Sequence, residues 1–296
     1  MAQREIKRSL VVAFFERSPH PIFWPSDLVA IFRRYRSIWG FPTRFSPSDF
    51  VKWMIDETKM HAIELECADY PSITRFVWDS ASTVAIALSL QKDAYLSHGS
   101  ALWGHGLRPD HGQIYINHEQ SEKPPNEGSL TQEAINKAFG RPPRETKLIY
   151  KMPGAIVRVL SGKHTGRLEV RKSRIPSGEV VPITSLERTL VDIVVRPNYA
   201  GGVEQVARVF GILRGQISIK RLANTLRALD YTYPYHQAVG FYLKHAGYAG
   251  SEQRVFAKHK RNFDFYLCNA ISDAVLDLDW RIFYPRTLAN RATGRT

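Results

Sequence analysis

Cysteine is scarce in this sequence, because only Cys67 and Cys268 occur among its 296 residues. They supply neither a disulfide framework nor the ligands of a cysteine-based metal site. Long apolar runs are lacking too, since no stretch approaches the roughly 20 apolar residues that span a bilayer. The basic start of the chain is followed by no cleavage pattern of a signal peptide. We therefore expect a cytoplasmic protein with two buried thiols and no association with a membrane.

Motifs that hold phosphates or metals are also lacking. The glycine-containing stretches at 104–106 and 162–164 are too short for a phosphate-binding loop. His98 and His105 lie seven residues apart, which is longer than the spacing of a zinc-binding helix, and no acid or cysteine nearby completes a ligand set. We expect both histidines to be structural. The sequence thus predicts no metal, no cofactor and no enzymatic activity.

Positive charge, by contrast, is abundant. Lys and Arg number 41 against 28 Asp and Glu, which gives a formal net charge of +13. Such an excess attracts phosphate backbones and acidic protein surfaces. The excess is uneven along the chain: residues 1–80 have a net charge of only +1, whereas residues 141–180 carry ten basic side chains against three acidic ones. A basic surface that is simply solvated is the alternative interpretation.

The first 80 residues contain three amphipathic segments followed by two short strand-like segments. Apolar periodicity and start signals predict helices over 4–17, from 26 to about 40 and after the N-cap Ser46, and strands over 61–67 and 73–78. Three short helices followed by a hairpin are typical of a winged helix-turn-helix. We therefore predict a first domain of this type at residues 1–80.

A winged helix-turn-helix binds DNA by placing its last helix in the major groove. Arg44 and Lys52, before and within the third predicted helix, are expected to face double-stranded DNA. Arg33, Arg34 and Arg36 on the second helix are expected to contact phosphates. Because this module is almost neutral, a unit that binds a protein partner without contacting DNA stays open as an alternative.

Residues 81–296 mix helical and strand-like patterns. We expect helices at 97–107, 130–139, 185–195, 203–213, 219–229 and 234–246, and strands at 113–117, 147–151, 155–160, 167–171 and 263–268. Ser129 and Thr184 are expected to begin capping boxes, and 121–128 is expected to be a loop. The predicted fold class is α+β, with an N-terminal winged helix-turn-helix followed by a larger mixed α/β C-terminal domain.

The basic excess of this second domain is expected on its strands and turns. There it would form a second basic surface, which follows a phosphate backbone or docks on an acidic protein. Its expected members are Arg144, Lys147, Lys151, Arg158, Lys163, Arg167, Arg171, Lys172 and Arg174.

Five segments of the chain resemble a known family. They are Tyr95-Leu-Ser-His-Gly-Ser-Ala-Leu-Trp-Gly-His-Gly-Leu107, 114–120, Thr184-Ser-Leu-Glu-Arg-Thr-Leu-Val-Asp-Ile193, 196–202 and 233–242. Together they resemble the AbiEi-type antitoxins, also described as predicted transcriptional regulators of viral (phage) defence systems of the type IV toxin-antitoxin class. The resemblance implies an antitoxin that represses its own promoter through the N-terminal module and neutralises a nucleotidyltransferase-like toxin through the C-terminal domain. It brings no catalytic residues.

Charged residues outside the basic clusters have their own interpretations. Arg188, Asp192 and Arg196 flank a buried apolar stripe, so we expect an internal set of ion pairs and hydrogen bonds. Asp277 and Asp279 would share one face of a strand, where two carboxylates can hold magnesium. A metal-dependent nuclease or nucleotidyltransferase is therefore the less favoured alternative. Whether DNA is bound by a monomer or a homodimer is left open, although helix-turn-helix proteins commonly pair.

Overall fold

A computed structural model of the chain describes residues 5–108, 112–122, 124 and 129–292. The chain divides into two compact units. The first contains the chain up to Lys92 together with Lys147–Val159, and the second contains Asp93–Thr146 and the chain from Leu160 onward. Arg4 of the first expected helix, and residues 123 and 125–128 of the expected loop at 121–128, lie outside the described residues.

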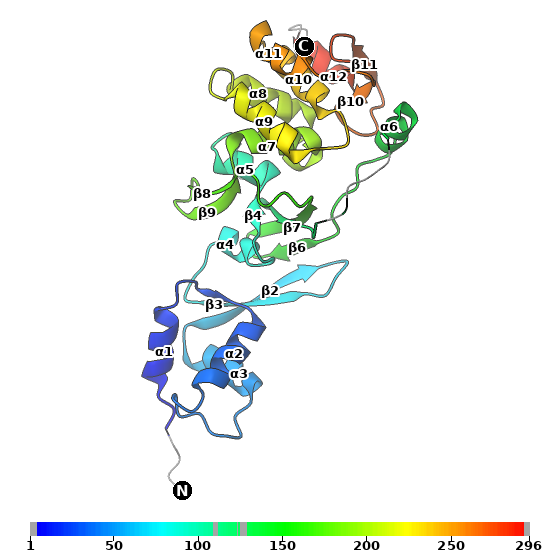
Figure 1. Cartoon of the computed structure of the whole chain (residues 1–296). Coiled ribbons are helices and arrows are strands. Elements are labelled where there is room, and N and C mark those ends of the chain that lie inside the picture. The colour runs from blue at the N-terminus through cyan, green and yellow to red at the C-terminus, as the bar shows by residue number, and fades with distance from the viewer. Residues whose placement is uncertain (1–4, 109–111, 123, 125–128, 293–296) are drawn as a thin grey trace. The chain divides into compact units, whose positions relative to one another are not determined.

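The first unit begins with three helices and a short strand. Its elements are α1 (Arg8–Glu16), β1 (Ile22–Phe23), α2 (Pro25–Tyr35), α3 (Pro47–Glu57), β2 (Met60–Cys67), β3 (Ile73–Trp78), α4 (Thr83–Leu88), β6 (Ile149–Met152) and the first five residues of β7 (Ala155–Gly162). Figure 1 shows α1, α2 and α3 gathered on one side of the β2–β3 hairpin. This arrangement is the expected winged helix.

The third helix starts where the sequence predicts. The Ser46 hydroxyl accepts a hydrogen bond from the Asp49 amide at 3.1 Å, and the Asp49 carboxylate accepts one from the Ser46 amide at 2.9 Å. Pro47 occupies the first helical position, where a missing N–H costs nothing. Phe50 and Met54, one turn apart, are fully buried on the inner face. The cap and the apolar stripe together fix the orientation of α3.

Aromatic side chains dominate the core of this unit. Phe50 stacks on Phe32 of α2 with ring centroids 4.8 Å apart, and Trp39 stacks on Phe50 at 5.9 Å. Phe15 of α1 stacks on Trp78 of β3 at 5.4 Å. Full burial of each such side chain contributes about 2–3 kcal/mol. All three helices and the hairpin therefore share one core.

The hairpin of the winged helix also has a second neighbour. β2 pairs antiparallel with β3 from Met60–Trp78 to Leu65–Ile73, and its end pairs with β6 through Glu66–Lys151 and Cys67–Tyr150. The strand order in this unit is β1-β3-β2-β6-β7. Residues 147–159 thus join the first unit, and the compact units divide the chain at a different place from the boundary near Ser80 expected from the sequence.

The second unit is larger and mostly helical. It holds β4 (Tyr95–Leu96), α5 (His98–Gly104), β5 (Gln113–Glu119), α6 (Gln132–Phe139), β8 (Val170–Arg174), β9 (Val180–Thr184), α7 (Leu186–Val195), a 3₁₀ turn (Pro197–Ala200), α8 (Val203–Ile212), α9 (Ile219–Leu229), α10 (Tyr235–His245), α11 (Gly250–Ala257), β10 (Phe265–Tyr266), β11 (Ala274–Asp277), β12 (Ile282–Pro285) and α12 (Arg286–Ala292). Its strands form an order β5-β4-β9-β8 and a separate sheet β10-β12-β11.

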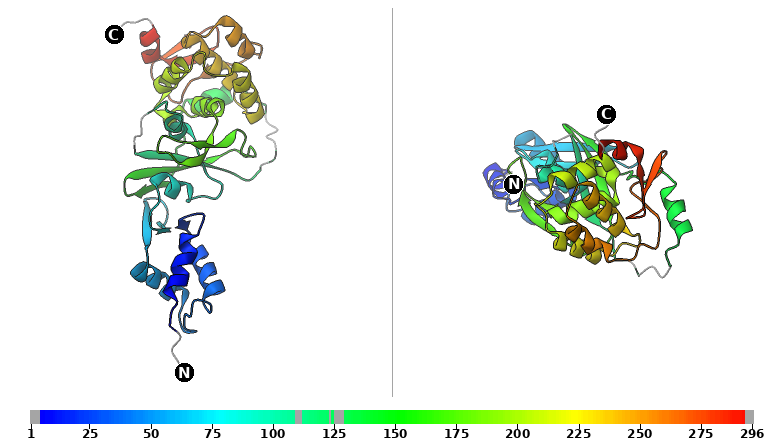
Figure 2. Two further views of the ribbon diagram at one scale, coloured as in Figure 1. Left: turned by 90° about the vertical axis from the view of Figure 1, so that its left-hand side faces the viewer. Right: turned by 90° about the horizontal axis from the view of Figure 1, so that it is seen from above.

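Helices α7 and α10 form the centre of the second unit. Nearly every residue of both is buried, and α8, α9 and α11 pack around them. Figure 1 shows this stack with α5 on its β4 side and the small sheet on the other. In Figure 2, α6 stands beside that small sheet, because Gln132 and the backbone of Asp264 exchange two hydrogen bonds of 2.8 and 2.9 Å. The strands of both sheets in the second unit therefore pack against one helical core.

Three local expectations are corrected. Ser185, not Thr184, caps α7, because the Thr184 hydroxyl bonds to that of Thr189 at 2.8 Å instead. Thr131, not Ser129, caps α6. The strand expected at 167–171 begins only at Val170, since Arg167 and Glu169 have left-handed φ angles of +57° and +56°.

The sequence also left several elements unpredicted, among them α4, α11, α12, β9 and β12. These are short segments of four to eight residues, for which apolar periodicity gives a weak signal. Among the described residues, none of the helices combines the length and the apolar content that a bilayer span requires.

Candidate nucleic-acid interface

Four of the five side chains expected to contact DNA are exposed on the winged helix. Arg33 and Arg34 lie in the last turn of α2, Arg44 lies in the connection between α2 and α3, and Lys52 lies on α3. Arg34 also lies beside the Tyr35 ring, with its guanidinium carbon 5.5 Å from the centroid. These residues are free to take part in binding a phosphate backbone.

Arg36 has a different role. Its guanidinium donates a hydrogen bond to the Thr43 carbonyl and lies 6.0 Å from the centroid of the Phe32 ring. It therefore ties the connection between α2 and α3 back onto α2. A guanidinium engaged in this way positions α3 and has less to offer a phosphate.

The outer face of α3 is chemically mixed. Ser48, Lys52 and Ile55 follow each other at helical spacing and are exposed, and exposed Asp56 lies beside them. The pKa of Asp49 is lowered, chiefly because its carboxylate accepts the backbone hydrogen bond of Ser46. That carboxylate is therefore kept charged as part of the cap. The α3 face therefore offers one cation, Lys52, among polar, acidic and apolar groups, and the other exposed cations expected to contact DNA lie outside α3.

Arg75 cannot contribute to this interface. It is only 2% exposed and donates hydrogen bonds to the carbonyls of Ser89, at 3.2 and 3.3 Å, and of Thr74, at 2.9 Å. Burial lowers its pKa, and Asp27 opposes this shift. The net charge of +1 for residues 1–80 includes Arg75, so the accessible surface of the module has no cationic excess.

The nine residues expected to form a second basic surface fall in both units. Lys147, Lys151 and Arg158 belong to the first unit, and the other six belong to the second. Several of those six are engaged within their own unit. Arg171 pairs with Glu169 at 2.9 Å, and Arg174 donates to the Gly178 carbonyl across the β8–β9 hairpin.

Lys163 and Arg167 hold loops of the second unit. The Lys163 ammonium donates to the carbonyls of Leu229 and Asp230, at 3.1 and 2.7 Å, where α9 ends and a cation is favoured. Arg167 donates to the Asp93 carbonyl and lies 5.4 Å from the centroid of the Tyr95 ring. Three cations of β8, Arg171, Lys172 and Arg174, are exposed, although Arg171 and Arg174 are also bonded within the unit.

The two carboxylates considered as magnesium ligands form ion pairs with a lysine. The Lys244 ammonium lies 2.6 Å from Asp277 Oδ2 and 2.5 Å from Asp279 Oδ2, and β11 ends at Asp277. The two aspartates therefore do not share one strand. Within the described part of the chain, no group of three or more His, Cys, Asp and Glu side chains is arranged to hold a metal ion.

The two histidines considered as ligands bond to protein atoms. His98 Nδ1 lies 2.9 Å from the Ser97 hydroxyl, and His105 Nε2 lies 2.8 Å from the Thr184 carbonyl. Burial lowers the pKa of His98 to about 3, and the pKa of His105 is lowered for the same reason. Both rings are thus neutral under ordinary conditions and part of the fold.

The expected ion pair on α7 is present. Arg188 Nε donates to Asp192 Oδ1 at 2.8 Å, and the side chains of both are 5% exposed. Arg188 also donates to the Leu168 carbonyl at 2.8 Å. The third expected member, Arg196, is exposed one residue beyond the end of α7.

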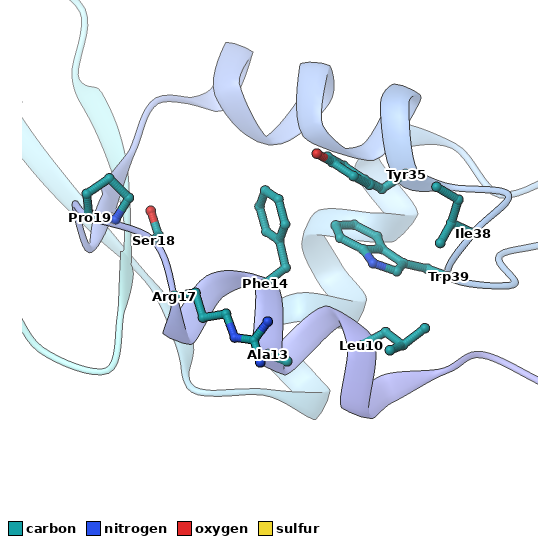
Figure 3. A pocket seen from close by; sticks show the side chains of 9 residues that line it. All are labelled: Leu10, Ala13, Phe14, Arg17, Ser18, Pro19, Tyr35, Ile38 and Trp39. Atoms are coloured by element: carbon teal, nitrogen blue, oxygen red, sulfur yellow. The ribbon is translucent and has the colours of Figure 1, made fainter.

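An apolar groove of about 470 Å³ lies between α1 and the end of α2 in the first unit (Figure 3). Phe14 and Trp39 form its floor, with ring centroids 5.5 Å apart, and Leu10 and Ile38 lie at its edge, 45% and 56% exposed. The helix expected from 26 to about 40 ends at Tyr35, so Ile38 and Trp39 lie in the segment after α2, where no groove was expected.

A winged helix joined to a larger mixed α/β unit is the class that this fold defines. The chain is similar to the crystal structure of the RV2827C protein from Mycobacterium tuberculosis, with a TM-score of 0.60 and 15% identity. The match covers 99% of this chain and 97% of that one, and at this identity it concerns the fold alone. No model of a known protein family matches the chain, and no curated protein matches it either.

Proposed function

We propose that the chain is a cytoplasmic antitoxin and transcriptional autorepressor of the AbiEi type, without an enzymatic activity of its own. The observation that carries this proposal is the winged helix whose α3 is flanked by exposed Arg33, Arg34 and Arg44 and carries exposed Lys52. The family-like segments of the second unit support the antitoxin half. The proposed partners are the double-stranded DNA of its own promoter and a nucleotidyltransferase-like toxin.

On DNA, α3 enters the major groove with Ser48 and Lys52 directed at base edges. Arg33, Arg34 and Arg44 contact phosphates and set the register, and Arg36 acts indirectly by holding the α2–α3 connection. Because the accessible surface of the module has no cationic excess, affinity rests on these few contacts. A homodimer that contacts two half-sites would double their number.

For the toxin, the exposed cations of β8 offer a docking surface. Arg171, Lys172 and Arg174 lie on an edge strand. Their positive charge favours an acidic partner surface and disfavours the addition of another strand to this edge.

The DNA half is tested by fluorescence anisotropy with the full chain. Labelled DNA from the upstream region of its own gene is compared with a scrambled duplex of equal length and composition. We expect tighter binding to the upstream duplex, and a loss of roughly tenfold or more in an Arg44→Ala/Lys52→Ala double variant. Lys92→Ala, an exposed cation after α4, is the matched control. Equal affinity for both duplexes would remove the repressor function.

The toxin half is tested by co-expression with the neighbouring nucleotidyltransferase-like reading frame. Capture of that protein should be lost when Arg171, Lys172 and Arg174 are all replaced by Glu, whereas binding to the upstream duplex should persist. If the wild-type chain captures nothing and does not restore growth to cells that express the neighbour, the antitoxin function is refuted.

The alternative of a partner-binding protein without DNA contact is favoured by one observation, the acidic and apolar side chains Ile55 and Asp56 on the outer face of α3. The duplex titration above separates the two. The enzymatic alternative rested on Asp277 and Asp279; a phosphoryl-transfer activity that disappears when both become Asn would revive it.

A further inference from the structure

A small polar cavity of about 110 Å³ lies in the second unit. This is the liquid volume of about four water molecules, so the cavity admits only a small group. Its polar lining comes from segments far apart in the chain: His98 of α5, Asn117 of β5, Lys163 after β7, Arg188 and Asp192 of α7, and Arg196.

Asp192, one of these lining residues, has a buried carboxylate oxygen without a partner among the described residues. Asp192 is 4% exposed, its Oδ1 accepts from Arg188, and its Oδ2 has no hydrogen-bond partner among the described residues. Burial raises the pKa of this carboxyl, and the Arg188 guanidinium counteracts that shift. A charge-bearing oxygen left unpaired in a buried place is costly, so a donor from a bound group or a water molecule would stabilise this atom.

Three cations line the same cavity. Arg188 uses Nε and Nη1 on protein acceptors, and no acceptor for its Nη2 is found within the described ranges. Lys163 is 51% exposed, and two of its three N–H groups are used on the carbonyls of Leu229 and Asp230, which leaves one for another acceptor. Arg196 is exposed, and no hydrogen bond or ion pair of its guanidinium is found within the described ranges. Three cations and one carboxylate therefore line the cavity, which favours a doubly charged anion.

The neighbouring acidic groups do not cancel this charge. The Glu119 carboxylate accepts from the backbone amides of Thr165 and Arg167 at 2.9 and 3.1 Å, and so it fixes the loop that carries Lys163. Asp230 lies 4.0 Å from the Lys163 ammonium but is 92% exposed, where water weakens the pair.

Two unusual backbone positions shape the wall of the cavity. A Cβ at Gly162 would lie 2.7 Å from the amide nitrogen of Asn117, so only glycine allows that side chain its place. His98 holds a left-handed φ of +48°, a conformation that costs about 1 kcal/mol or more for a residue other than glycine, and its ring lines the cavity.

We propose that this cavity binds a phosphate group that carries one proton, with Arg188, Arg196 and Lys163 donating to its charged oxygens and Asp192 Oδ2 accepting its P–OH. Free phosphate in neutral solution is the anion that offers both features. Sulfate has the same size and charge but no proton, so Asp192 repels it. The site is independent of DNA binding, and either property can fail without the other.

The test is isothermal titration of the full chain at pH 8 with sodium phosphate and, separately, sodium sulfate at matched ionic strength. We expect one saturable site for phosphate and affinity for sulfate lower by roughly tenfold or more, the value of one hydrogen bond to a charged group. Arg196→Ala and Lys163→Ala should each weaken phosphate binding by about tenfold. The exposed cations Arg208 and Lys220 supply matched controls, Arg208→Ala and Lys220→Ala, which should bind as the wild type does.

Asp192→Asn tests the proton. An amide has no negative charge to repel sulfate, so the preference for phosphate over sulfate should vanish in this variant. Circular dichroism and a thermal melt without anions establish whether this variant folds. If it does not fold, Arg196→Ala and Lys163→Ala still test the site. The source of the bound phosphate group is tested with a nucleoside 5′-monophosphate at pH 6, where about half of its phosphoryl groups keep a proton. It should displace bound phosphate if the cavity takes phosphomonoesters, and leave it bound if the cavity takes only free phosphate.

Three results would overturn the proposal. If phosphate binding is not saturable, the cavity holds only water and is no anion site. Equal affinity for sulfate would remove the role of Asp192. Phosphate binding that is unchanged in both Arg196→Ala and Lys163→Ala would put the bound anion elsewhere on the chain.

Discussion

The guanidinium of Arg75 lies over the indole of Trp24, with its central carbon 4.0 Å from the ring centroid. The same guanidinium donates to the Ser89 carbonyl, in the turn that follows α4. A cation on β3 thus joins the start of α2 to the end of α4. Arg75 is one of the basic residues counted in the net charge of +1 for residues 1–80, and it is buried.

Replacing Arg75 by Met should lower the free energy of unfolding of the first unit by about 2–4 kcal/mol, because buried carbonyls lose their donor and Trp24 its cation. Arg75→Lys should rescue little of this loss, since one ammonium cannot stack and reach Ser89 at once. Urea denaturation followed by tryptophan fluorescence measures both variants. Arg33→Met, on the surface, should change stability by less than about 0.5 kcal/mol.

Gly240 in α10 faces Trp280 so closely that a Cβ would lie 2.1 Å from the indole. Gly240→Ala should therefore destabilise the second unit by about 3 kcal/mol or more through overpacking. Gly211 in α8 is the matched control, because nothing lies within 4 Å of its added Cβ. Gly211→Ala should instead stabilise by about 0.5–1 kcal/mol through helix propensity. Equal effects in a thermal melt would show that α10 does not pack as described.

The buried His98 makes stability depend on pH. Burial lowers its pKa to about 3, with Arg196 and Arg188 adding to the shift, whereas the unfolded chain has an ordinary value of 6.5. Unfolding therefore takes up a proton below pH 6.5, and stability present above that pH is lost as the pH falls toward 3. At pH 5 this single group should cost about 2 kcal/mol relative to pH 7.

The matching measurement is urea denaturation of wild type and His98→Asn at both pH values. Asn tolerates the left-handed φ and does not titrate, so its stability should fall by about 2 kcal/mol less between pH 7 and pH 5. His20→Asn, at an exposed site, should fall as the wild type does. An unchanged pH dependence in His98→Asn would show that this ring is not buried in solution.

Salt dependence separates the arginines of the winged helix. If Arg44 contacts a phosphate, Arg44→Ala should reduce the slope of log affinity against log salt by about 0.9. Arg36→Ala should lower the thermal stability of the first unit and leave the slope almost unchanged, because its guanidinium is engaged by Thr43. The opposite pattern, a slope change for Arg36 alone, would exchange the two roles.

Local features of the fold could be predicted from the sequence where neighbours along the chain decide the outcome. The Ser46 cap with Pro47 and Asp49 fixes the start of α3, and the helix expected at 219–229 has those bounds in the structure. The predicted N-cap of α7 was wrong by one residue. Thr184 and Ser185 are both suitable N-cap residues, and only the buried hydrogen bond between the Thr184 and Thr189 hydroxyls decides between them.

Long-range placement could not be predicted in the same way. Nothing near Glu66 indicates that it will pair with Lys151, and nothing near Arg75 indicates burial beside Ser89. The same limit holds for the sites. The sequence located the exposed cations of the winged helix, but the polar cavity joins residues from segments far apart in the chain, of which only Arg188, Asp192 and Arg196 were expected to interact.

The pairing of β2 with β6 has a consequence for how the protein is made. The first unit is discontinuous in the chain, since β6 and the start of β7 follow an insertion of more than fifty residues. A ribosome that has finished the winged helix has not yet supplied the strand that pairs with the end of β2 at Glu66 and Cys67. That end stays unpaired until about 160 residues have emerged, so a gene product shortened after β3 would expose backbone groups that invite pairing with another chain.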